Sequence, residues 1–314
     1  MSAGTLVKYV GGLGTVLLDD GQILGKVALR GIFRHDEIKP LVGDKVCVSC
    51  DDSVRIDEIL PRRNVLVRPP IANVDCLVMV LSEAPPKSDP MLADSLTVTA
   101  ECYGIDVVIA VNKSDIDEGK HWQERYAASG YPVFAVSAET GSGIAGLKTV
   151  LCGKIVVLAG KSGVGKSSLL NALFPDLALQ TGEISERLKL GKHTTRHVEL
   201  ISCDCNTKPS QEQIKANTTS SIERQGDSAL SAASRRSLIA DTPGFTIYDP
   251  TCIKGKTPGE LAYCYPEMRP YIDQCRYRSC RHERDEGCAI LQAVQDGKIS
   301  PERHATYVAL LAAL

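Results

Sequence analysis

The chain has 314 residues, 43% of them hydrophobic and 24% charged, and its formal net charge is −2. This length favours two or three domains, and the composition argues against a disordered, fibrous or membrane-spanning chain. A charge this close to zero attracts nucleic acid only through local patches. Because the N-terminus carries no signal-peptide pattern, we expect a cytoplasmic protein in which the twelve cysteines stay reduced.

Residues 1–64 carry short apolar stretches separated by Gly and Asp turn signals. These stretches cover residues 6–10, 14–18, 23–29, 45–48 and 54–60. Short strands joined by close turns predict a small β-barrel. An OB-type barrel is our preference, although an SH3-like barrel would produce much the same pattern. A basic connector interrupted by prolines, residues 61–70, marks the boundary of this domain.

Residues 65–250 alternate buried-strand runs with helical patterns. The strand runs cover residues 76–81, 107–111, 133–136, 155–159, 198–202 and 238–240. Such alternation predicts an α/β domain with a largely parallel sheet. Residues 203–236 are rich in Ser, Thr, Asn, Gln and charge, which predicts a long mobile insertion.

A phosphate-binding pattern joins the strand at 155–159 to the helical stretch at 168–174. It consists of Gly160, Lys161, Ser162, Gly163, Val164, Gly165, Lys166, Ser167 and Ser168. The glycines allow backbone N–H groups to wrap around a phosphate, Lys166 reaches the β- and γ-phosphates, and the Ser167 hydroxyl ligates Mg²⁺. The alternative is a flexible turn without a ligand, which the complete P-loop pattern disfavours.

A second polar motif, Asn112-Lys113-Ser114-Asp115, follows the strand at 107–111. A carboxylate here accepts hydrogen bonds from guanine N1–H and N2–H₂, for which adenine has no equivalent donors. The motif resembles the NKxD motif of the GTPase superfamily. That resemblance implies that Asp115 selects guanine, Asn112 braces the loop and Lys113 lies along the ring. A polar cap at the start of a helix is the alternative.

Two further motifs complete the resemblance to the GTPase superfamily. Ser137-Ala138 resembles the loop whose backbone amide contacts guanine O6, and Asp241-Thr242-Pro243-Gly244 resembles the DxxG switch. The resemblance implies that Asp241 holds Mg²⁺ through water and that the Gly244 amide senses the γ-phosphate. NKxD and SA precede the P-loop here, so the cyclic order is intact but cut elsewhere. We therefore expect a circularly permuted P-loop GTPase domain.

The residues expected to drive hydrolysis lie between the P-loop and DxxG. Thr194 or Thr195 should bind Mg²⁺ and the γ-phosphate, with Thr195 our choice. Phe245 replaces the glutamine that orients water in many GTPases, which predicts slow intrinsic hydrolysis that a partner accelerates. His193 is a candidate for orienting this water, although a surface histidine without a role is as compatible with the sequence. The catalytic set is His193, Lys166, Thr195 and Gly244.

Residues 251–314 predict a helical zinc-binding domain. The candidate ligands Cys275, Cys280, His282 and Cys288 have the spacing C-x4-C-x-H-x5-C. Three thiolates and one imidazole suit a closed, structural Zn²⁺ site. Cys264 is a less favoured competitor of His282, and reduced cysteines without a metal are the alternative. Nearby arginines either bind a phosphate backbone or form a solvated face. Helices are expected at 289–295 and 301–314.

The motifs together resemble the RsgA (YjeQ) family of small-ribosomal-subunit-dependent GTPases over nearly the whole chain. The resemblance implies GTP hydrolysis to GDP on the small ribosomal subunit (30S) late in its assembly. It also implies rRNA contacts by the barrel and zinc domain, and a catalytic role for the histidine at 193. Two departures are the long 203–236 segment and Arg196, which replaces the third threonine of many members.

The expected partners are GTP or GDP and the small subunit with its rRNA, with no membrane and with the chain as a monomer. One rival hypothesis is a nucleotide-gated RNA-binding protein with little turnover, favoured by Phe245. A second is a P-loop ATPase or kinase, which Asp115 disfavours.

Overall fold

The computed structural model describes residues 2–30, 39–49, 54–177, 198–205, 236–241 and 250–314, with only the backbone at Asp176, Asp241 and Pro250. Its contacts divide the chain into two compact units. Unit 1 comprises Met1–Asp75, Gly141–Val157 and Leu170–Phe245, and unit 2 comprises Cys76–Thr140, Leu158–Leu169 and Thr246–Leu314. The three-domain division with boundaries at 64 and 250 stays a prediction.

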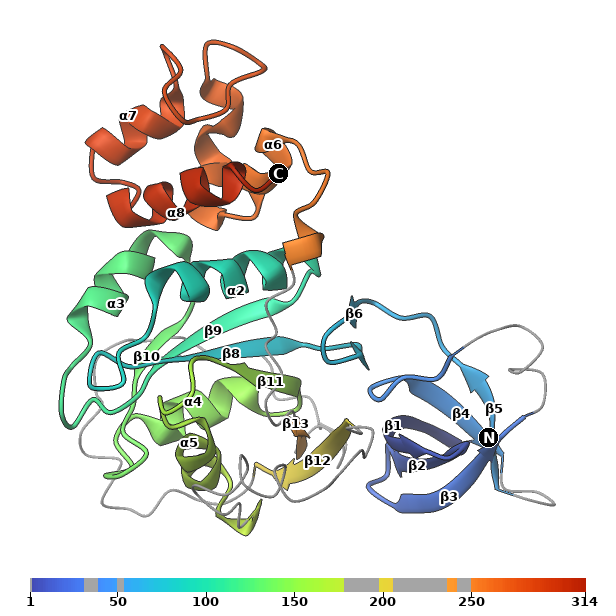
Figure 1. The fold of residues 1–314 in the computed structure, drawn as a ribbon. Helices are drawn as coiled ribbons and strands as arrows, with labels where there is room; N and C mark the ends of the chain where they lie inside the picture. Colours follow the sequence, from blue (N-terminus) through green and yellow to red (C-terminus); the bar gives the residue numbers. More distant parts are fainter. Residues whose placement is uncertain (1, 31–38, 50–53, 178–197, 206–235, 242–249) are drawn as a thin grey trace, which may run out of the picture. The chain divides into compact units, whose positions relative to one another are not determined.

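A closed barrel forms the N-terminal part of unit 1 (Figure 1). Its strands are β1 (Ser2–Val10), β2 (Leu13–Leu18), β3 (Ile23–Leu29), β4 (Lys45–Ser49) and β5 (Arg55–Ile59). They pair in the order β1-β2-β3-β5-β4-β1, with β3 and β5 parallel and the other pairs antiparallel. Buried Leu6, Val16 and Ile56 fill the interior. This closed pairing confirms the OB-type barrel.

The rest of unit 1 contains β-strands of the α/β domain. A short hairpin, β6 (Val65–Leu66) and β7 (Ile71–Ala72), precedes α4 (Ile144–Leu151) and β11 (Ile155–Ala159), whose last two residues are assigned to unit 2. β11 runs parallel to β13 (Arg236–Asp241), whereas β12 (Glu199–Asp204) is antiparallel to β13.

The ends of the predicted insertion belong to this β12–β13 pair. Asp204 is the partner of Arg236, and Cys203 is the partner of Ser237. Ladder hydrogen bonds therefore extend the strands beyond the apolar runs from which they were predicted. Residues 206–235 lie outside the described part of the chain.

Unit 2 contains the parallel strands β8 (Cys76–Leu81), β9 (Asp106–Val111) and β10 (Val133–Ala135). Every residue of β8 is buried, as expected for an inner strand of a covered parallel sheet. α2 (Pro90–Cys102) and α3 (Lys120–Tyr126) lie along one side of these strands (Figure 1). The Asp89 side chain caps α2 by accepting a hydrogen bond from the Met91 backbone N–H.

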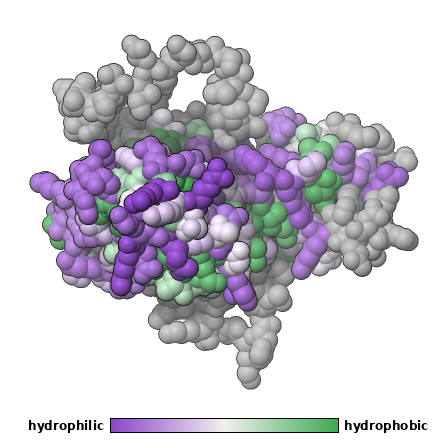
Figure 2. Space-filling view, turned by 90° about the horizontal axis from the view of Figure 1, so that it is seen from above, coloured by the Kyte–Doolittle hydropathy of each residue, from purple (hydrophilic) through white to green (hydrophobic). Residues whose placement is uncertain are grey.

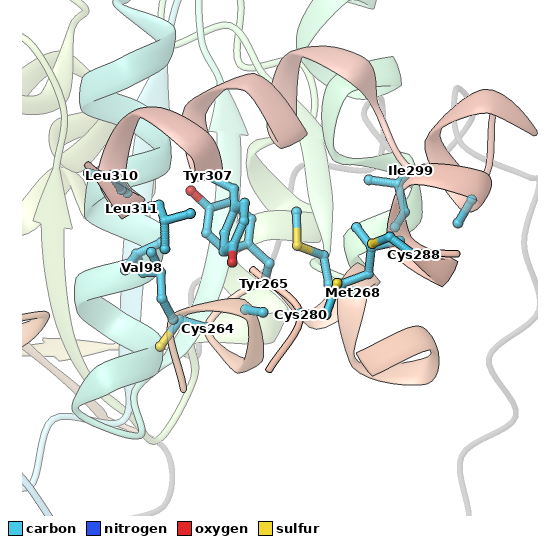
Figure 3. Packing of buried hydrophobic residues seen from close by; sticks show 14 of the residues in the cluster. Val98, Cys264, Tyr265, Met268, Cys280, Cys288, Ile299, Tyr307, Leu310 and Leu311 are labelled. Atoms are coloured by element: carbon cyan, nitrogen blue, oxygen red, sulfur yellow. The ribbon is translucent and has the colours of Figure 1, made fainter. Parts of the chain in front are cut away.

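The C-terminal module of unit 2 packs against α2 (Figure 1). It comprises η5 (Pro250–Cys252), α6 (Pro258–Tyr263), η6 (Pro266–Gln274), α7 (Ala289–Gln295) and α8 (Pro301–Leu311). Its core includes Tyr265, Met268 and Tyr307 and reaches Val98 of α2 (Figure 3). Among the helices described, none has the length and apolar character needed to cross a bilayer.

A buried ionic network also joins the module to α2. Arg303 of α8 donates to Asp94 of α2 and to Glu267 of η6, each at 2.7 Å, and Arg125 of α3 donates to Asp94 as well. Burial raises the pKa of Asp94, but Arg303 and Arg125 outweigh this effect and hold the pKa below its ordinary value. Removing one member of such a network leaves a buried charge without its partner, which is strongly destabilising.

Candidate functional site

The phosphate-binding loop of unit 2 has a backbone that excludes side chains at two glycines. A Cβ at Gly160 would lie 2.3 Å from the Val80 carbonyl oxygen, and one at Gly165 would lie 2.4 Å from Asn112 Nδ2. Both glycines have positive φ, at +143° and +92°. The loop therefore needs glycine for its conformation and for its close contacts with neighbouring loops.

Lys166 begins α5 (Lys166–Leu173) directly after this loop. Its Nζ donates to the carbonyl oxygens of Gly160 at 2.8 Å and Lys161 at 2.9 Å. Burial lowers the pKa of Lys166, because the charged ammonium loses contact with water. An ammonium group carries three donors, so this group can bind a phosphate oxygen in the loop as well.

Asn112 connects the three loops that the sequence assigned to one nucleotide. Its Nδ2 donates to the Val164 carbonyl in the phosphate loop at 2.9 Å, and its Oδ1 accepts from the Ala138 backbone N–H at 3.1 Å. The residue is only 2% exposed. Asn112, Val164 and Ala138 come from separate stretches of sequence, and this one carboxamide holds them together.

The neighbouring residues of the Asn112 loop are also held in place. Lys113 has a φ of +64°, and its Nζ donates to the Pro85 carbonyl at 2.7 Å. Asp115 accepts a hydrogen bond from the Ser137 hydroxyl, which in turn accepts from the Thr140 backbone N–H. The structure thus brings Asp115, Ser137 and the phosphate loop into one hydrogen-bonded assembly within unit 2.

Sequence reasoning missed the contribution of residues 82–88. The Lys87 carbonyl accepts from Lys161 Nζ at 3.1 Å, just as the Pro85 carbonyl accepts from Lys113. The position of this segment could have indicated its role. It follows β8, and ligand sites of parallel sheets lie beyond the carboxyl ends of the strands.

Several predicted site residues cannot be placed in this assembly. His193, Thr195 and Gly244 lie outside the described residues, as do Thr194 and Phe245. Asp241 is described by its backbone alone, as the last residue of β13. Their assigned roles in magnesium binding and hydrolysis stay predictions.

A second site lies in the C-terminal module, where Cys275, Cys280, His282 and Cys288 converge. One potential ligand atom from each residue lies within 4.8 Å of all the others. The Cys275 and Cys288 sulfurs are 3.9 Å apart, and His282 Nδ1 is 3.5 Å and 3.6 Å from them. Tetrahedral Zn²⁺ with ordinary bond lengths requires S–S and S–N separations of about 3.8 and 3.5 Å. The cluster is therefore compatible with zinc.

The backbone around His282 supports this arrangement. His282 has a φ of +61°, and its carbonyl oxygen contacts His304 Nε2 of α8 at 2.7 Å. Burial lowers the pKa of His282, which favours the neutral imidazole that a metal requires. Cys264, the competing ligand considered from sequence, does not belong to the described cluster of four.

Comparison with known proteins identifies the family. The family model described as RsgA GTPase matches residues 59–208. The small ribosomal subunit biogenesis GTPase RsgA of Ruminiclostridium cellulolyticum is 35% identical over 320 residues, covering 100% of this chain and 94% of that protein. The chain belongs to the RsgA GTPase family.

Solved structures agree with this assignment. The crystal structure of YjeQ from Thermotoga maritima has a TM-score of 0.75 and 29% identity, covering 99% of this chain and 97% of that chain. The crystal structure of YloQ, described as a circularly permuted GTPase, has a TM-score of 0.74 and 31% identity, covering 99% and 94%. The permuted order of the motifs is thereby confirmed, and the chain is a GTP-hydrolysing enzyme, a class that works with Mg²⁺.

Proposed function

We propose that this GTPase acts late in the assembly of the small ribosomal subunit and hydrolyses GTP to GDP and phosphate when it is bound there. The observation that carries the proposal is 35% identity along the whole chain to a small ribosomal subunit biogenesis GTPase. Similarity confined to the GTPase domain would support nucleotide hydrolysis alone. We further propose that the protein works as a monomer in the cytoplasm.

GTP is proposed to bind in the assembly of loops braced by Asn112. Asp115 would accept hydrogen bonds from guanine, Ala138 would offer its backbone N–H near O6, and the backbone of residues 160–168 would surround the phosphates. The bond from Ser137 to Asp115 supports this role, because it orients a carboxylate oxygen. Lys166, already paired with two loop carbonyls, would exchange such contacts for phosphate oxygens.

Hydrolysis is proposed to depend on positioning and charge stabilisation. Ser167 and Thr195 would ligate Mg²⁺, and Asp241 would hold it through water. His193 would orient the attacking water, and the Gly244 amide would sense the γ-phosphate. Phe245 cannot polarise water, so turnover would stay slow until the ribosomal subunit stimulates it.

The Cys₃His cluster is proposed to hold one structural Zn²⁺. The distances among Cys275, His282 and Cys288 support this proposal, as does the small size of the module. Bound zinc would cross-link the loop between η6 and α7, and with four protein ligands it would leave no position for substrate.

The exposed face of the zinc module is proposed to contact rRNA, together with the barrel. The loop that carries the metal ligands exposes Arg276, Arg278, Arg281 and Arg284. Tyr277, 47% exposed, lies beneath the Arg276 guanidinium and offers a ring for stacking on a base. Hydrophilic residues predominate among the coloured residues on the face seen in Figure 2.

The proposed function is tested by measuring GTP turnover with small subunits, with large subunits and without ribosomes. We expect stimulation by small subunits alone, loss of turnover in Lys166→Ala, and wild-type turnover in Lys120→Ala, which changes an exposed lysine paired only with Glu118 among the described residues. Equal stimulation by both subunits would refute the small-subunit assignment. Binding to small subunits without any stimulation would favour a nucleotide-gated RNA-binding protein.

Guanine selectivity is tested separately by competition. Excess ATP should leave labelled GTP bound, whereas excess GTP should displace it. Displacement by ATP at equal concentration would contradict the role of Asp115.

A further inference from the structure

Two cysteines outside the metal cluster face each other across the contact between α2 and the C-terminal module. Cys102 is the last residue of α2, and Cys264 directly follows α6. Their sulfurs are 3.5 Å apart, although the residues are separated by 162 positions in the sequence. Both are reduced thiols in the structure.

Packing and a buried charge pair hold the two cysteines next to each other. Figure 3 shows Cys264 beside α2 and close to Val98. On the same side of α2, buried Asp94 is bound to Arg303 of α8, which fixes the module against the helix by a charge pair as well as by packing. The Asp94–Arg303 pair and the hydrophobic packing are both buried. Together they keep the two sulfurs in contact without a covalent bond between them.

We propose that Cys102 and Cys264 are an oxidation-sensitive thiol pair. On oxidation they form a disulfide that links the C-terminal module covalently to α2. The sulfurs must approach by about 1.5 Å to reach the bond length of about 2.05 Å.

The chemistry needs a two-electron oxidant, for which a peroxide suffices. The Cys264 thiolate attacks one oxygen of hydrogen peroxide, the O–O bond breaks, and the departing hydroxide takes up a proton to become water. The Cys102 sulfur then attacks the resulting sulfenic acid, loses its proton and expels the hydroxyl group as a second water. Two thiols and one peroxide thus give one disulfide and two waters.

The two cysteines differ in a way that suits these two steps. The hydrogen bond from Cys102 and the charge of Lys256 lower the pKa of Cys264 against the opposing effect of burial. Hydrogen bonds with Cys252 and Cys264 raise the pKa of Cys102. Cys264, although buried, is therefore the thiol of the pair that ionises more readily, and the partly exposed Cys102 then attacks its sulfenic acid.

The test is peptide mapping of the full-length, zinc-loaded protein after treatment with hydrogen peroxide. Trypsin releases Cys102 in residues 88–113 and Cys264 in residues 257–276, because cleavage does not occur between Arg269 and Pro270. We expect these two peptides to be joined, and fragment ions must assign the link to Cys264, since Cys275 lies in the same peptide. The link should disappear after dithiothreitol.

Variants separate this disulfide from its rivals. Cys102→Ser and Cys264→Ser should each abolish the link, whereas the control Cys252→Ser, which removes the other sulfur near Cys102, should leave it intact. In the wild-type protein, oxidation should raise the unfolding temperature by about 5 °C or more, as expected for closing a long loop, and neither serine variant should respond. The proposal would be overturned if no link formed at peroxide levels that leave all four metal ligands unoxidised, or if the link joined Cys102 to Cys252 or Cys275 instead.

Discussion

The Asn112 carboxamide is the group whose removal should do most harm to the assembly of nucleotide loops. Asn112→Ala deletes the bonds to the Val164 carbonyl, which is buried, and to the Ala138 N–H, which is partly buried. An unpaired buried carbonyl costs about 1–3 kcal/mol, and the second bond contributes about 1 kcal/mol. The braced arrangement should therefore lose about 2–4 kcal/mol.

In this variant, part of the free energy of GTP binding is used to bring the loops into the braced arrangement. A loss of about 2–4 kcal/mol corresponds to a Kd for GTP that is roughly 30- to 700-fold higher. The assay is titration with a fluorescent GTP analogue, combined with urea unfolding to measure the free energy of unfolding. A Kd within threefold of the wild-type value would refute the bracing role of Asn112.

A matched control is available elsewhere in the chain. Asn73, 8% exposed, also makes two hydrogen bonds to backbone groups, accepting from Arg63 at 2.8 Å and donating to Gly43 at 3.0 Å. Asn73→Ala should lower the free energy of unfolding by at least as much, because alanine is also strained at the φ of +56° that Asn73 adopts, and it should leave the Kd for GTP within threefold. If Asn73→Ala weakened GTP binding as much as Asn112→Ala, general destabilisation would explain both.

Further predictions concern the phosphate loop, the ionic network and the metal cluster. Gly165→Ala should raise the Kd for GTP at least tenfold by the same titration, because its Cβ would lie 2.4 Å from Asn112 Nδ2 at a positive φ. Arg303→Met should lower the free energy of unfolding by about 3–5 kcal/mol in urea, because it leaves Asp94 and Glu267 buried without this cation. The pKa of Asp94 is lower in the folded chain, so its stabilisation is complete above its unfolded value of about 3.9 and is lost as the pH falls through the folded value. Acid titration of stability should accordingly be less steep below about pH 4 in Asp94→Asn than in the wild type. Cys280→Ser should abolish stoichiometric zinc, measured by elemental analysis, while GTP binding stays within threefold; retention of zinc would contradict the assigned ligand set.

The loop chemistry could be predicted because each motif is a local structure. The phosphate loop needs glycine at positions 160 and 165 because the backbone has a positive φ there, and the spacing of these glycines in the sequence is part of the P-loop pattern. The ligand spacing of the Cys₃His cluster confines four donors to fourteen residues, from Cys275 to Cys288, so chain connectivity alone keeps them close. The OB-type barrel was predicted from short apolar stretches separated by turn signals, although this pattern left an SH3-like barrel open until the strand pairing decided between them.

Other features depend on distant residues and have no local pattern. Asp94 and Arg303 are 209 positions apart, and neither residue type predicts burial on its own. Residues 82–88 were passed over because they contribute carbonyl oxygens, which every residue possesses. The predicted bounds of the insertion, 203 and 236, were wrong. In the structure, residues 203 and 236 still belong to β12 and β13, and each pairs across the ladder.

The sequence by itself determined which chemical groups the chain offers to a guanine nucleotide and to a metal, and in which cyclic order. Only the tertiary structure decided that one Asn112 side chain joins three loops, that Arg303 binds the C-terminal module to α2, and that Cys102 lies against Cys264. The physical reason is range. Motifs are fixed by the conformational preferences of adjacent residues, whereas these contacts arise when packing brings together side chains whose positions in the chain carry no record of each other.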